Sequence, residues 1–193
     1  MSMTWIRTIA FEESTGRLRD LYERCKGGGG RVDNILTAHS LRPHTLDGHL
    51  HLYRNVLHNP ANRLPTWILE AVGVYVSVLN GCRYCVDHHS QGLRRQLGDD
   101  GRWQAIHAAL TADRPDVAFA DRELAMFRYA RRLTLTPVAM EESDVIELRD
   151  AGLDDGEILE LNQVVAYFAY ANRTVLGLGV TTAGDVLGTT PGA

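Results

Sequence analysis

The chain has 193 residues and a formal net charge of -4, with 45% hydrophobic and 23% charged residues. This length fits one domain with a single substantial core, and the weakly acidic balance gives no general attraction to nucleic acid or anionic lipid. The longest apolar runs, 71–79 and 164–171, are far shorter than the roughly 20 residues that span a bilayer. We therefore expect one globular domain with neither a nucleic-acid nor a membrane partner.

The first predicted elements follow from helix start and stop signals. Ser14 stands where an N-cap would, a helix follows to Arg24, and the run Gly27–Gly30 ends it. Residues 1–30 are thus expected to form an extension of the domain. A short helix over 33–40 and a longer one over 43–58, opened by a proline, come next.

The rest of the chain also has helical patterns, each with a proline, an acidic residue or a glycine at its ends. Runs of β-branched residues within two of these segments could support strands, but the segments are about 16 to 25 residues long, whereas strands usually span about 4–8. The fold class is therefore all-α: a compact helical bundle in one domain, 1–193, with a flexible tail over 183–193. The remaining helices are expected at 65–80, 82–98, 100–110, 121–133, 141–150 and 154–178.

The segment Ile158–Leu178 is apolar on nearly all sides. A helix of that kind lies at the centre of a fold or in a subunit contact. A chain this small can hardly cover it alone, so we expect a homo-oligomer.

Cysteine use indicates the compartment and the kind of site. The N-terminal segment has no apolar stretch of signal-peptide length and becomes acidic at Glu12 and Glu13, so cytoplasmic residence is expected. Three cysteines do not make a disulfide scaffold, and no role is assigned to the isolated Cys25. In a reducing compartment, the pair Cys82 and Cys85 indicates a redox or metal site.

The spacing around this pair favours thiol chemistry. Cys82 falls at a helix start, where backbone N–H groups and the helix dipole lower a thiol pKa from about 8.5 to roughly 3.5–7.5. Cys85 lies in the first turn, and His89, four residues later, shares its face. Glu70, twelve residues before Cys82, can return toward the cysteines if the two helices pack antiparallel. A thiolate, a second thiol and a base are the groups that peroxide reduction needs.

The pattern Glu70, eleven residues, Cys82, two, Cys85, three, His89 resembles the active-site signature of the alkylhydroperoxidase D and carboxymuconolactone decarboxylase-like superfamily, especially its peroxidase-related branch. The phrase NGCRYCVDHH matches it closely, and GLDDGEILELNQVVAYFAYANR is similar to its C-terminal helix. The resemblance implies an all-α fold in homo-oligomers, often trimers or hexamers. It also implies that Cys85 attacks the peroxide, Cys82 resolves the product, and His89 and Glu70 relay protons. Tyr84 departs from the pattern, which has a second histidine there.

The expected activity is thus a dithiol-dependent peroxidase for hydrogen peroxide or organic hydroperoxides. It calls for no metal, haem or flavin, and an unidentified dithiol reductant is its partner. Two alternatives stay open: a non-redox, carboxymuconolactone decarboxylase-like enzyme, and a zinc-stabilised or redox-sensing interaction protein with a CxxC half-site. His88 is expected to point away from the site, because consecutive helix residues diverge by about 100°.

Overall fold

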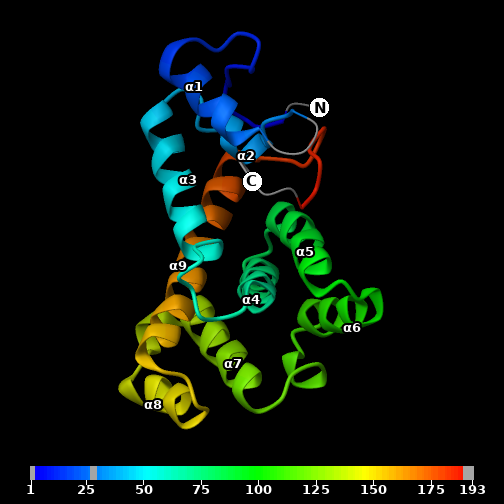
Figure 1. Cartoon of the computed structure of the whole chain (residues 1–193), viewed down its shortest axis with the longest axis vertical. Helices are drawn as coiled ribbons and strands as arrows, with labels where there is room; N and C mark the ends of the chain where they lie inside the picture. Colours follow the sequence, from blue (N-terminus) through cyan, green and yellow to red (C-terminus); the bar gives the residue numbers. More distant parts are fainter. Residues whose placement is uncertain (1–2, 27–29, 189–193) are drawn as a thin grey trace.

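The computed structural model describes residues 3–26 and 30–188, and within them every regular element is a helix. The expected all-α fold is confirmed. The helices, drawn in Figure 1, are α1 (Gly16–Cys25), α2 (Asn34–Thr37), α3 (Pro43–Leu57), α4 (Thr66–Leu79), α5 (Arg83–Leu97), α6 (Asp100–Thr111), α7 (Asp121–Leu135), α8 (Glu142–Asp150) and α9 (Asp155–Leu178), with short 3-10 turns η1 (Pro115–Val117) and η2 (Pro137–Ala139).

The observed ends differ little from the expected ones. The first helix begins at Gly16 with Thr15 as N-cap, because the Ser14 hydroxyl donates to the carbonyl of Phe11 instead of capping. The two 3-10 turns were not expected, since each is only three residues long and begins at a proline. The glycine connector at 27–29 lies outside the described residues.

Helix α4 is the centre of the bundle, with α3, α5, α7 and α9 around it (Figure 1). Every residue from Ile68 to Ser77 is buried. At Gly73, an added Cβ would lie 2.2 Å from the ring of Phe168 in α9. The β-branched run therefore forms a buried helix, and a glycine allows its closest contact.

A tight turn joins α4 to α5. Gly81 has a φ of +68°, its N–H donates to Val78 at 3.0 Å, and the N–H of Cys82 donates to Ser77 at 2.8 Å. This is a Schellman motif, which ends a helix and lets the chain reverse. Cys82 thereby becomes the N-cap of α5, and the two helices pack side by side.

Helix α9 begins with a reciprocal capping box between Asp154 and Glu157 and ends at Gly179. Its central residues, among them Val164 and Phe168, are buried against α4. One face of this helix is therefore buried within the chain. On its outer side, Leu159, Tyr170 and Leu176 stay 59%, 39% and 44% exposed.

The two ends of the described chain meet near the C-terminus of α9. The N–H of Trp5 donates to Leu178, and the N–H of Thr181 donates to Met3. Residues 183–188 then fold back toward α2 and α5, the red segment at the top of Figure 1. Asp185 in this segment accepts hydrogen bonds from Asn34 and Tyr84, which are distant in sequence. The flexible tail expected over 183–193 stays a prediction, and 189–193 lie outside the described residues. Within the described part of the chain, no helix is long and apolar enough to cross a membrane.

Candidate active site

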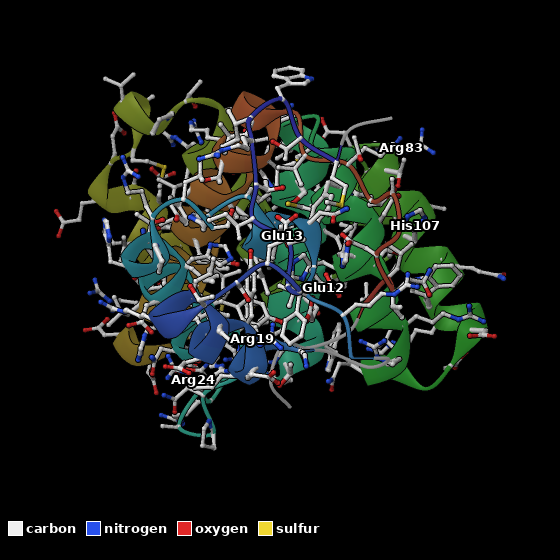
Figure 2. All side chains as sticks on the ribbon, turned by 90° about the horizontal axis from the view of Figure 1, so that it is seen from above. Glu12, Glu13, Arg19, Arg24, Arg83 and His107 are labelled. Atoms are coloured by element: carbon white, nitrogen blue, oxygen red, sulfur yellow. The ribbon has the colours of Figure 1, made fainter. Side chains whose placement is uncertain are left out.

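Both cysteines of the CxxC pair are free and buried at the start of α5. Arg83, between them in sequence, projects from the rim of the molecule with 91% of its side chain exposed (Figure 2). The Cys85 thiol is the first cause of a lowered pKa at Cys82, opposed by burial and aided by the Cys85 backbone N–H and the Asn172 amide. The same contact with Cys82, and then burial, hold the pKa of Cys85 well above its ordinary value. Of the two thiols, Cys82 therefore loses its proton more readily.

Glu70 and His89 form the pair expected from the sequence. The Nδ1 atom of His89 lies 2.7 Å from Oε2 of Glu70, and both side chains are largely buried. Because an ionised carboxylate only accepts, Nδ1 carries the proton and Nε2 is left to exchange one. Gly92 allows this approach, since a Cβ there would meet the Glu70 carboxyl at 3.2 Å.

A second imidazole, that of His58, also approaches the Glu70 carboxylate. The Nε2 atom of His58 lies 4.0 Å from Oε1 of Glu70 and 2.8 Å from the hydroxyl oxygen of Tyr53. The chain Tyr53, His58, Glu70, His89 therefore links α3, α4 and α5 through polar groups. Sequence reasoning did not identify the first two members, because nothing in the spacing brings α3 to α5.

Cys85, His89 and Glu70 open into one cavity, which encloses about 570 Å³ of space including its mouth. Cys82 does not line it, so the cavity reaches the pair through Cys85. The lining residues are Asp33, Ile35, Leu36, His49, Tyr53, Glu70, Tyr84, Cys85, His88, His89, Gly92, Tyr167, Ala171 and Gly188.

The C-terminal segment supplies a second polar cluster at this cavity. The Tyr84 hydroxyl donates to Asp185 at 2.8 Å, and the Asn34 N–H donates to the same carboxylate at 3.1 Å. His88 stacks on Tyr84 and places Nε2 3.2 Å from Asp185. The expectation that His88 points away is therefore wrong. Tyr84 and His88 are four residues apart and share a face turned to the C-terminal segment, a neighbour that the sequence does not reveal.

Asn172 of α9 interacts with the thiols of Cys82 and Cys85. Its amide donates to Ser77 at 3.0 Å and its carbonyl oxygen accepts from Asn80 at 2.9 Å, so the side chain is fixed in one orientation. The only sequence signal for this residue was a polar side chain inside an apolar helix. As for a metal, no group of three or more His, Cys, Asp or Glu side chains in the described residues is arranged to hold one.

The fold and this sequence have recognisable relatives. Residues 43–132, which contain α3 to α6 and most of α7, match the Carboxymuconolactone decarboxylase family. An alkylhydroperoxidase AhpD core protein, an uncharacterized peroxidase-related protein from Ralstonia eutropha JMP134, has a similar structure with a TM-score of 0.81 and 18% identity over 94% of this chain and 93% of that one. Residues 43–132 thus resemble the Carboxymuconolactone decarboxylase family, and the chain as a whole has the fold of the alkylhydroperoxidase AhpD core protein.

Two further solved structures have a similar fold. A peroxidase-related protein from Silicibacter sp. TM1040 has a TM-score of 0.76 and 22% identity, over 94% of this chain and 90% of that one. The debrominase Bmp8 has a TM-score of 0.71 and 17% identity, over 93% and 90%. No curated protein sequence matched the chain significantly. The cavity that brings Cys85 together with the hydrogen-bonded pair Glu70 and His89 is the candidate active site.

Proposed function

We propose that the protein is a dithiol-dependent peroxidase in which Cys85 attacks hydrogen peroxide or an organic hydroperoxide. The observation that carries the proposal is the shared cavity: Cys85 opens into the same space as the hydrogen-bonded pair Glu70 and His89. A thiol that reacts with a peroxide needs a neighbour to accept its proton and return one to the leaving oxygen. His89, with one ring nitrogen on Glu70 and the other free for exchange, fits that need.

The reaction has two steps. The Cys85 thiolate attacks one peroxide oxygen, the O–O bond breaks, and His89 protonates the departing alkoxide or hydroxide, which leaves Cys85 as a sulfenic acid. The Cys82 sulfur then attacks the Cys85 sulfur, water leaves, and a disulfide forms. In total, one hydroperoxide and two thiols give one alcohol, one water and one disulfide.

Turnover then requires a dithiol that reduces the disulfide by exchange. The cavity exposes Cys85 and not Cys82, so the reductant reaches the pair through the same opening or after a movement of α5.

The test is peroxide consumption by reduced protein with excess dithiothreitol. We expect hydrogen peroxide or cumene hydroperoxide to be consumed much faster than by a Cys82→Ser/Cys85→Ser variant, which lacks both thiols and keeps the cavity otherwise unchanged. Equal rates for the two proteins with both peroxides would sink the proposal.

Removal of bromine from an aromatic compound is a second candidate. The cavity beside the dithiol has aromatic walls, and the similar fold of the debrominase Bmp8 has been seen with 2,3,4-tribromopyrrole. Two thiols would supply the two electrons, giving bromide, a carbon–hydrogen bond and a disulfide. Bromide release from that pyrrole, absent in the double cysteine variant, would favour this candidate. A carboxymuconolactone decarboxylase-like activity would instead survive the loss of both thiols.

A further inference from the structure

We propose that the cavity selects uncharged hydroperoxides with a compact apolar or aromatic body against anionic ones, and that Asp33 is the carboxylate responsible for much of this discrimination. The inference rests on the proposed peroxidase function and adds the substrate class of the same cavity.

The walls of the cavity suit an apolar body. Ile35, Leu36 and Ala171 supply aliphatic surface, while Tyr53 and Tyr167 lie with their rings 6.0 Å apart. These side chains come from α2, α3 and α9, opposite the cysteine and its base on α5. Burial of a small ring against such surface contributes about 25 cal/mol for each Å² of apolar area removed from water.

The charges of the cavity disfavour an anion. Among its lining residues there is no lysine or arginine, while two, Asp33 and Glu70, are carboxylic acids. His49 also lines it, but burial lowers its pKa to about 3, so it is neutral at physiological pH. A substrate carboxylate would find no fixed cation there to replace its lost water.

Asp33 differs from the other acidic groups at this site. The two imidazoles each face their own carboxylate, His89 on Glu70 and His88 on Asp185. No ion pair within 4.0 Å joins Asp33 to any cation among the described residues, although it is only 8% exposed. Burial raises its pKa to about 6, with Asp185 acting in the same direction and His88 opposing. At pH 7.5, above this value, the carboxylate is ionised and has no ion-pair partner, although His88 and His89 oppose its charge from beyond ion-pair distance.

The experiment compares two substrates of one shape: 4-carboxycumene hydroperoxide and its methyl ester, each reduced with excess dithiothreitol at pH 7.5. We expect kcat/KM for the ester to exceed that for the acid by about tenfold or more. Tenfold is about 1.4 kcal/mol, which is the repulsion of two like charges about 12 Å apart at an effective dielectric constant near 20. Asp33→Asn removes the charge at nearly constant volume and should reduce this ratio by about threefold or more. Asp116→Asn in η1, which makes the same change at an exposed ion pair, should leave the ratio as it is.

Each possible result of this comparison either supports or overturns the proposed selection. An acid reduced as well as its ester, or an unchanged ratio in Asp33→Asn, would overturn the selection or the role of Asp33. The wild-type ratio needs no variant, so it serves even if Asp33→Asn fails to fold. If no peroxide is reduced at all, the peroxidase proposal fails, and calorimetric binding of the two corresponding unreactive alcohols still measures selection: equal affinities would overturn it.

Discussion

The two cysteines of the CxxC pair have different surroundings. Cys82 holds the lower pKa, first because the Cys85 thiol interacts with it, while Cys85 has the access to the cavity and to His89. Acidity therefore favours one sulfur and access favours the other. Because a peroxide must reach the sulfur before it can react, we assign the attack to Cys85.

Single variants test this assignment. Cys82→Ser should still form a sulfenic acid on Cys85, which then persists or is oxidised further for lack of a resolving thiol. Cys85→Ser should lose rapid reaction with peroxide. Mass spectrometry after one equivalent of peroxide identifies the modified residue. A sulfenic acid on Cys82 in Cys85→Ser, formed as fast as in the wild type, would reverse the two roles.

His49 is a buried imidazole whose Nδ1 has no hydrogen-bond partner in the described residues. Burial lowers its pKa from 6.5 to about 3, with His39 and His89 acting in the same direction. Between these values the unfolded chain binds more protons than the folded one, so stability is full above about pH 6.5 and falls as the pH drops toward 3. The loss is up to about 5 kcal/mol at the acid end.

His49→Phe should remove this dependence. Free energies of unfolding from urea titrations at pH 4 and pH 7.5 should differ less in the variant than in the wild type, by several kcal/mol. His44→Phe, on the exposed side of the same helix, is the control and should keep the wild-type difference. The same difference in His49→Phe and the wild type would contradict the prediction.

Helix α4 approaches α9 so closely that only glycine fits at position 73. A Cβ there would lie 2.2 Å from two atoms of the Phe168 ring, which is fully buried and has no free space to move into. Gly73→Ala should therefore destabilise the protein by about 1–3 kcal/mol, the usual cost of overpacking a core.

Gly48 of α3 gives a matched control, because it is exposed and a Cβ there meets nothing within 4 Å. Gly48→Ala should stabilise by about 0.5–1 kcal/mol, since alanine loses less freedom than glycine in a helix. Thermal unfolding of the two variants beside the wild type measures the contrast. If both changed stability in the same direction, the contact between α4 and α9 would be looser than described.

The exposed apolar residues of α9 bear on the oligomeric state of the whole molecule. The chain buries one face of α9, while Leu159, Tyr170 and Leu176 remain exposed along the helix. We predict a homo-oligomer, so light scattering at micromolar concentration should give a mass that is a multiple of 21.4 kDa. A strictly monomeric mass would mean that these side chains are ordinary surface residues.

The sequence by itself determined the helices and the core of the candidate site. Start and stop signals such as Pro43 and the Asn80–Gly81 turn act over one helical turn, so they can be identified without tertiary information. Cys82, Cys85 and His89 share one helix, and their mutual placement follows from its period. Glu70 is reached through the adjacent turn, so its contact with His89 could also be expected.

Only the tertiary structure shows which residues surround these four side chains. Asp33 and His49 line the cavity, and Asp185 of the C-terminal segment meets Tyr84 and His88 of α5 beside it. These contacts join segments remote in sequence, and they turn His88 toward the C-terminal segment. Helical periodicity gives the angle between neighbouring side chains but not the direction of the nearest partner, because that direction is set by contacts between residues far apart in the chain.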